Sequence, residues 1–171
     1  MLIVDNFYSP FDFSDIIRFI KESKFTPTMQ PKNINYDNRL KGYPCYESIP
    51  TDRIKEITLR SLREKTPYKF KNLKTEFRKI FAKELLQSPL ANQKEGILHK
   101  DDEHAYAGVI YFDGLTIKGG TSLFFTDDQI EPDIIYAARP NRLILHKSDI
   151  MHCANYDYCY KERTIQTIFL Q

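Results

Sequence analysis

The chain has 171 residues, of which 28% are charged and 42% are hydrophobic, and its formal net charge is +2. This length favours one domain, and the composition is too apolar and aromatic for an intrinsically disordered chain. No apolar stretch reaches about eighteen residues, and the first residues lack the pattern of a secretory signal. We therefore expect no membrane association and a cytoplasmic location.

The first half of the chain is predicted to be mostly helical. A short apolar strand at 2–4 precedes a helix at 15–20, for which Ser14 is the expected N-cap. A second helix is predicted from Thr51, its N-cap, to about Lys65.

Two further segments of this half are harder to assign. Residues 26–50 carry four prolines and no clear periodicity, which predicts a long loop, and such loops often act as lids. Residues 73–86 fit both a helical stripe of apolar residues and the alternation of a strand, so their periodicity does not decide between helix and strand.

Positive charge is concentrated in residues 51–83, which contain eleven basic and four acidic residues. A basic surface can bind an acidic partner such as nucleic acid. More often such a run is a solvated face whose charges are partly paired. No phosphate-binding loop or RNA-binding motif accompanies it, so nucleic acid is an alternative partner that we do not favour.

From Gly96 onward the pattern is that of short strands separated by turns. Strands are predicted over 106–112, 121–125, 142–146 and 164–170. Such spacing predicts a two-sheet barrel or jelly roll with the helices packed outside. The cysteines, Cys45, Cys153 and Cys159, lack metal-site spacing and are interpreted as reduced structural thiols.

The residues that point to chemistry lie in this second half. His99 and Asp101 are two positions apart and share one face of an extended segment, and His152 follows the strand that ends near His146. Two histidines and one carboxylate can occupy one face of an octahedron and leave three positions open, as in non-haem Fe(II) oxygenases.

Arg163 strengthens this interpretation. It begins the last strand, and a guanidinium inside a barrel needs an anionic partner. A dicarboxylate co-substrate would supply one carboxylate to Arg163 and its other end to the iron, and the Tyr111 hydroxyl is placed to bind the same carboxylate. The alternative is a structural salt bridge between Arg163 and a surface glutamate.

Other polar residues have more ordinary interpretations. His104 is expected in an exposed turn, and His146 is expected to pack near the site. Arg78 points into the pocket if its segment is a strand and is otherwise a solvated charge. The alternating tyrosines either line a substrate groove or pack on the core; they are Tyr156, Tyr158 and Tyr160.

Taken together, these segments resemble the 2-oxoglutarate/Fe(II)-dependent dioxygenases, in their prolyl-4-hydroxylase-like branch. The resemblance rests on the order and spacing of motifs within residues 96–171 and on the opening segment 3–8. These motifs are His99-Lys100-Asp101, Val109-Ile110-Tyr111-Phe112, Gly119-Gly120 with the strand after it, Asn141 to His146, His152 and Arg163.

The resemblance implies an α+β, mainly β fold, a double-stranded β-helix (jelly roll) with two or three supporting N-terminal helices. It implies one oxygenase domain over 1–171, in which 1–95 provide helical support, a lid loop and edge strands and 96–171 form the metal-binding core. It also implies that residues 74–83 are a strand.

The resemblance further implies a site and a reaction. Fe(II) is expected on His99, Asp101 and His152, which are the catalytic residues, and 2-oxoglutarate on Arg163 and Tyr111. The expected reaction hydroxylates a C–H bond with O₂ and releases succinate and CO₂. The primary substrate, a protein side chain or a small molecule, cannot be read from the sequence.

Two departures from the family pattern stand out. Ile165 occupies the position where many members place a serine or threonine that helps bind the co-substrate, and Thr164 and Thr167 are candidate substitutes. Asp101 is present, unlike in halogenating relatives, so hydroxylation is expected.

Two other functions remain open. One is a non-oxidative, cupin-like protein in which His99, Asp101, His104 and His152 hold another metal. The other is a basic nucleic-acid-binding module on the same fold.

Overall fold

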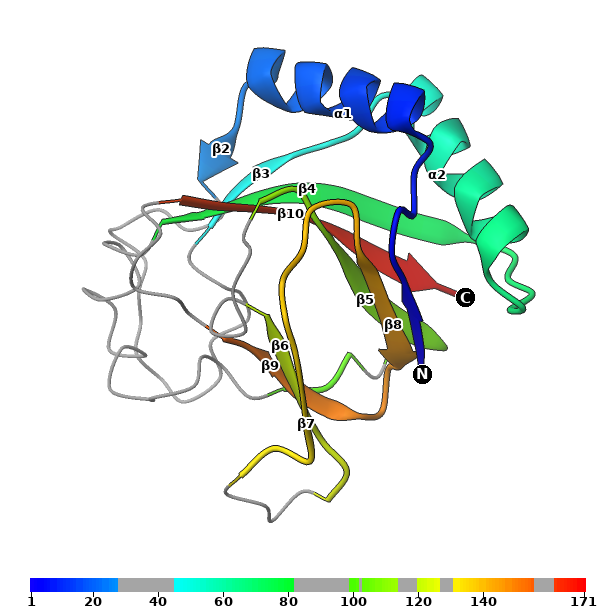
Figure 1. Ribbon diagram of the computed structural model, residues 1–171, viewed down its shortest axis with the longest axis vertical. Coiled ribbons are helices and arrows are strands. Elements are labelled where there is room, and N and C mark those ends of the chain that lie inside the picture. Colours follow the sequence, from blue (N-terminus) through cyan, green and yellow to red (C-terminus); the bar gives the residue numbers. More distant parts are fainter. Residues whose placement is uncertain (28–44, 82–98, 102, 114–119, 127–130, 156–161) are drawn as a thin grey trace.

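The computed structural model describes residues 1–27, 45–81, 99–101, 103–113, 120–126, 131–155 and 162–171 (Figure 1). Within these residues two antiparallel sheets face each other. The larger has the strand order β1-β8-β5-β10-β4-β3-β2 and the smaller the order β7-β6-β9. The fold is therefore α+β and mainly β, a jelly roll with two helices, as the sequence predicts.

The strands of the larger sheet are β1 (Leu2–Val4), β2 (Thr26–Pro27), β3 (Tyr46–Ser48), β4 (Leu73–Phe81), β5 (Tyr106–Tyr111), β8 (Leu143–Lys147) and β10 (Glu162–Leu170). Those of the smaller sheet are β6 (Thr121–Phe124), β7 (Ile134–Tyr136) and β9 (Met151–Ala154). The sequence predicts β1, β5, β6, β8 and β10. It does not predict β7 or β9.

Two helices, α1 (Pro10–Glu22) and α2 (Asp52–Lys65), cover the outer face of the larger sheet (Figure 1). Apolar residues on one side of each helix are buried against side chains from the sheet. The fully buried members of this core include Ile16, Leu62, Phe77, Ile110, Leu143, Leu145 and Ile168. A smaller cluster, which includes Ile80, Ile144 and Ile165, lies on the other side of the sheet. None of the helices in the described residues is long and apolar enough to cross a bilayer.

Of the two predicted helix starts, that of α2 is confirmed and that of α1 is wrong. Thr51 caps α2 by accepting a hydrogen bond from the backbone of Ile54, as expected. The prediction that Ser14 caps α1 is wrong. The helix starts at Pro10, and Ser9 is the cap because its hydroxyl accepts from the backbone of Asp12 while proline fits the first helical position.

The prediction of a long loop at 26–50 is wrong at the two ends of this segment, which pair with each other as β2 and β3. Residues 28–44, the middle of the segment that was expected to act as a lid, lie outside the described residues.

The ambiguous segment is a strand over its described part, as the resemblance implies. β4 pairs with β10 from Leu73 to Phe81, and β3 pairs with its other edge. Alternate residues of β4 therefore face the helices or the smaller sheet. Phe77 is fully buried under the helices, whereas Arg78 points to the opposite side.

The basic segment is largely paired with carboxylates. Six of its basic side chains lie within ion-pair distance of an acid, namely Arg53, Lys55, Arg60, Lys74, Arg78 and Lys79. This pairing agrees with the expectation of a solvated face whose charges are partly paired.

Candidate metal centre and the adjoining pocket

The backbone brings His99, Asp101 and His152 to one place between the two sheets. His152 lies on β9, and its backbone exchanges two hydrogen bonds with that of His99, at 2.9 and 3.0 Å. The Asp101 amide donates to the carbonyl of Ser148 at 2.9 Å. The 99–101 segment is thus held beside β9 by main-chain bonds, which bring together side chains that are far apart in sequence.

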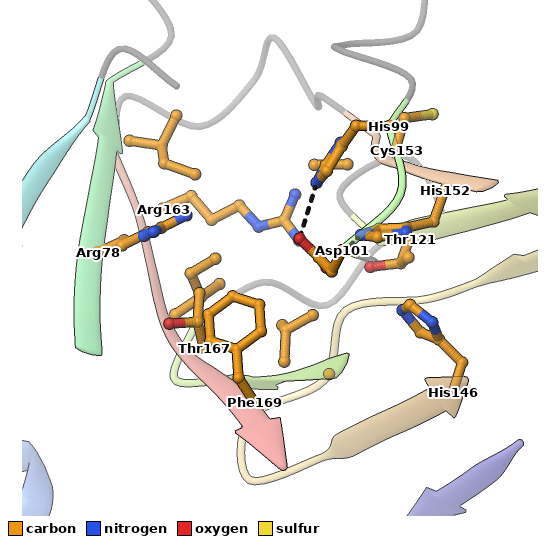
Figure 2. Close-up of a pocket in the computed structure, with 15 residues that line it drawn as sticks. Arg78, His99, Asp101, Thr121, His146, His152, Cys153, Arg163, Thr167 and Phe169 are labelled. Carbon is orange, nitrogen blue, oxygen red and sulfur yellow. Dashed lines mark ion pairs between the residues drawn. The ribbon is translucent and has the colours of Figure 1, made fainter. Parts of the chain in front are cut away.

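The three side chains form a compact group of ligand atoms. All three atoms lie within 4.8 Å of one another, with Asp101 Oδ2 3.3 Å from His152 Nε2 and Asp101 Oδ1 3.9 Å from His99 Nε2 (Figure 2). His152 Nδ1 lies 3.0 Å from the Ile150 carbonyl, which can only accept a hydrogen bond. That contact places the proton of a neutral His152 on Nδ1 and turns the Nε2 lone pair toward Asp101.

This arrangement fits a divalent cation. A neutral Nε2 lone pair and a carboxylate oxygen at 3.3 Å repel each other unless a cation or a proton lies between them. Two imidazoles and one carboxylate are the donor set typical of non-haem Fe(II). In the part of the chain that the structure describes, these are the three potential ligands whose atoms lie close enough together to share one metal ion.

The charge state of the group suits metal binding. Burial by itself would raise the pKa of Asp101, but the close contact with His152 and the nearby His99 and His146 outweigh burial and hold that pKa below its usual value. Burial and repulsion from His152 lower the pKa of His146 to about 4. His146 is therefore neutral at pH 7, and Asp101 provides the negative charge.

The two other histidines do not belong to the group. His146 is buried with its ring centroid 4.4 Å from that of His152, and its Nδ1 contacts the Lys147 carbonyl, so it packs beside the site as expected. His104 was expected to be exposed, but it is half-buried with its ring 4.7 Å from that of Phe169. It lies outside the three-residue group, so the four-ligand set of the cupin-like alternative is not assembled.

A pocket of about 90 Å³ opens beside the three side chains. Four alternate residues of β10 line it; they are Arg163, Ile165, Thr167 and Phe169. Arg78 lines the pocket from β4 (Figure 2). A cavity of this size has room for several water-sized groups and therefore for a small ligand.

The Arg163 guanidinium lies inside this pocket. Its Nη1 donates to the carbonyl of Asn155 at 2.8 Å and its Nη2 to that of Gly120 at 3.3 Å, while its Nε is buried without a partner. In the described residues Arg163 forms no ion pair, so the alternative of a structural salt bridge is wrong there. A buried cation with a spare donor fits an anionic ligand.

Tyr111 lies directly beside Arg163. Its ring is 5.0 Å from the guanidinium carbon, and its hydroxyl lies 2.5 Å from the hydroxyl of Thr121. Burial raises the pKa of Tyr111, although the Arg163 charge opposes this, so the hydroxyl stays protonated and can donate.

Thr121 is a site residue that the sequence reasoning missed. It lines the pocket, whereas Thr164 does not, and Thr167 is on the lining as suggested. The glycine before it indicates a close approach of two backbones and not a pocket residue. A Cβ on Gly120 would lie 1.4 Å from the carbonyl of Tyr136, so a glycine is needed for β6 to approach β7 this closely.

Several predicted residues lie outside the described part of the chain. They are the three alternating tyrosines 156, 158 and 160, and Cys159. Cys45 and Cys153 are buried, in keeping with structural thiols.

Comparison of the structure with solved structures supports the fold. The chain is similar to an oxidoreductase of the 2OG-Fe(II) oxygenase family from Burkholderia pseudomallei, with a TM-score of 0.62, 10% identity, and coverage of 98% of this chain and 83% of that one. It is also similar to a prolyl-4-hydroxylase from Pseudomonas putida, with a TM-score of 0.59, 12% identity, and coverage of 99% and 91%.

A third similar structure is a prolyl hydroxylase from Trichoplax adhaerens, in complex with a peptide fragment of the hypoxia inducible factor oxygen degradation domain. Its TM-score is 0.58 with 15% identity, over 99% of this chain and 82% of that one. No protein-family model matches the chain, and no curated protein matches it in sequence. The chain therefore has the fold of the 2-oxoglutarate/Fe(II) oxygenases, prolyl hydroxylases included. Between its two sheets lie three residues, His99, Asp101 and His152, that could hold a metal ion.

Proposed function

We propose that the protein is an Fe(II)- and 2-oxoglutarate-dependent dioxygenase, and that residues 1–171 act as one oxygenase domain. In the proposed reaction a substrate C–H bond, O₂ and 2-oxoglutarate give the hydroxylated substrate, succinate and CO₂. One atom of O₂ enters the alcohol and the other enters succinate, so the reaction is balanced.

One observation carries the proposal. The His99, Asp101 and His152 ligand atoms and the buried Arg163 guanidinium line a single pocket. Either feature alone is compatible with a purely structural role. A metal with a chelating dicarboxylate accounts for both, because one end of that ligand needs the metal and the other needs a cation.

Each residue has a defined part in this proposal. His99, Asp101 and His152 would hold Fe(II), and the bound metal would supply the activation of O₂. Arg163 would bind the distal carboxylate of 2-oxoglutarate, with Tyr111 and Thr121 adding hydroxyl contacts. The apolar lining, which includes Val109 and Ile165, limits water in the pocket.

The substrate class is less defined. The fold similarity to prolyl hydroxylases, one of them bound to a peptide, supports a protein side chain. A small molecule is also compatible with the pocket volume.

The experiment that tests the proposal compares metal content and succinate formation in matched variants. His99→Ala and Asp101→Ala should each lose bound Fe(II) after dialysis and should form no succinate from 2-oxoglutarate. His104→Ala, which removes a histidine outside the group, should keep both. Succinate formation at the wild-type rate in Asp101→Ala would contradict the proposal.

A further inference from the structure

A second guanidinium, that of Arg78, lines the pocket and has no part in the proposed chemistry. Arg78 lies at the middle of β4, opposite Ile165 of β10, and reaches into the pocket from the β4 side (Figure 2). Its neighbour Phe77 is buried under the helices, and Lys79 lies over the ring of Phe25 at 4.7 Å. Arg78 is thus the charged residue of β4 that lines the pocket.

Two carboxylates hold Arg78 in place. Its Nη2 donates to Glu76, two residues earlier on β4, at 3.1 Å, and its Nε lies 3.0 Å from Glu47 on β3 but is buried without a hydrogen-bond partner. Neither glutamate lines the pocket. Among the described residues, Nη1 has no hydrogen-bond partner, and its two N–H groups are available to a ligand.

The charges on the pocket lining indicate which kind of ligand Arg78 can bind. The charged lining residues are Asp101, Arg163 and Arg78. With Fe(II) and doubly charged 2-oxoglutarate bound, Asp101 and Arg163 bring the inner part of the site to neutrality. Arg78, although paired with Glu47 and Glu76, is then the remaining cation on the described lining of a pocket that still has to accept the primary substrate.

We propose that Arg78 is a specificity-determining residue that binds a carboxylate of the primary substrate through Nη1. Glu47 and Glu76 fix the plane of the guanidinium, which limits the directions from which a carboxylate can approach. This inference rests on the proposed function, and it names the substrate class as carboxylate-bearing. The carboxylate belongs either to a free amino acid or to an acidic residue of a peptide.

The test is calorimetric binding to protein loaded with Mn(II) and 2-oxoglutarate. One arm compares the L-amino acids with their C-terminal amides. The other compares capped proline-containing peptides carrying Asp or Glu with the same peptides carrying Asn or Gln. In at least one arm the acid should bind about ten-fold to a hundred-fold more tightly than its neutral counterpart, the contribution expected of a charge-assisted contact.

Matched variants connect this preference to Arg78. Arg78→Gln should abolish the preference for acids and leave 2-oxoglutarate affinity unchanged, and Arg78→Lys should restore part of it. Lys79→Gln, which removes a charge from the same strand on the other face, should keep the preference. Glu47→Gln should strengthen acid binding, because it removes a competing carboxylate and leaves Arg78 in place.

Three results would overturn the inference. They are no acid preference in the wild-type protein, a preference that survives Arg78→Gln, or a loss of 2-oxoglutarate affinity in Arg78→Gln. Failure of the wild-type protein to bind 2-oxoglutarate with Mn(II) would instead refute the proposed function, so the two failures are distinguishable.

Discussion

The two faces of the larger sheet are built from the same strands but differ in how completely their polar groups are paired. On the helix-covered face, Gln166 is fully buried, accepts from Tyr8 at 2.7 Å and donates to Thr58 and Thr75 at 3.1 and 2.9 Å. On the pocket face of the same strand, Arg163 keeps a buried Nε without a partner.

The difference separates stability from function. A buried polar network in which every group is paired stabilises one arrangement of the core, whereas an unpaired buried cation costs free energy until a ligand satisfies it. Substitutions on the helix-covered face should therefore change the free energy of unfolding, and substitutions on the pocket face should change ligand affinity.

The largest effect is expected from Phe77→Ala on the helix-covered face. The fully buried ring packs against Phe19 and Phe112, so its loss should lower the free energy of unfolding by about 3–5 kcal/mol. Urea unfolding measures this. Thr167→Ala on the pocket face is the control and should lower the free energy of unfolding by less than about 1 kcal/mol. Equal losses in the two variants would contradict the proposed difference between the two faces.

Among the residues proposed to contact 2-oxoglutarate, Arg163 should show the largest effect when it is replaced by alanine. Loss of a charge-assisted contact of about 1.5–3 kcal/mol corresponds to roughly ten- to hundred-fold weaker 2-oxoglutarate binding. Fe(II) binding should survive, because Arg163 is not among the three proposed ligands. Arg163→Lys should recover part of the affinity, since an ammonium does not reproduce the planar fork.

The measurement is the 2-oxoglutarate dependence of succinate formation, with metal content checked in each variant. Arg139→Ala removes an exposed arginine outside the pocket and serves as the control. An unchanged half-saturation concentration in Arg163→Ala would show that its role is structural.

Tyr8→Phe tests the paired network. The variant leaves Gln166 without the hydroxyl donor that it accepts from, which should lower the free energy of unfolding by about 1–3 kcal/mol. Affinity for 2-oxoglutarate should not change, because Tyr8 lies on the helix-covered side. Thermal and urea unfolding, together with a 2-oxoglutarate titration, check both parts, and a weakened co-substrate would contradict the separation of the two faces.

Tyr111→Phe is expected to have the smallest effect. It removes one neutral hydrogen bond of about 0.5–1.5 kcal/mol, which corresponds to a roughly two- to ten-fold weaker co-substrate. Thr121→Val should act in the same range if both hydroxyls contact the carboxylate. Titrations of the two variants that match the wild type would remove both residues from the proposed binding site.

The same contrast explains which features the sequence could predict. The helix α2 and its Thr51 cap follow from local spacing, because an apolar stripe and a cap are signals within one turn or two. The start of α1 was misplaced although Ser9-Pro10 carried the usual signal, since Ser14 competes with it in sequence and only the hydrogen bond from the Asp12 backbone decides.

The features that local patterns could not predict depend on pairing between strands far apart in sequence. β4 was ambiguous because Phe77 and Phe81 fit both helical and strand periodicity, and its pairing with β10 makes it a strand. Residue types and order predicted the grouping of His99, Asp101 and His152. Thr121 and the pairing of Arg78 with Glu47 depend on strand neighbours far apart in sequence, which no local pattern reveals.

The most direct test of the central claim is an anaerobic titration of the protein with Fe(II) and then 2-oxoglutarate, followed by visible absorption. The wild-type protein should develop a metal-to-ligand charge-transfer band that saturates at one equivalent of each. The double variant His99→Ala/His152→Ala should show no band and no tight Fe(II) binding, while His104→Ala should match the wild type. A double variant that still binds one equivalent of Fe(II) tightly and develops the band would contradict the assignment of the metal site.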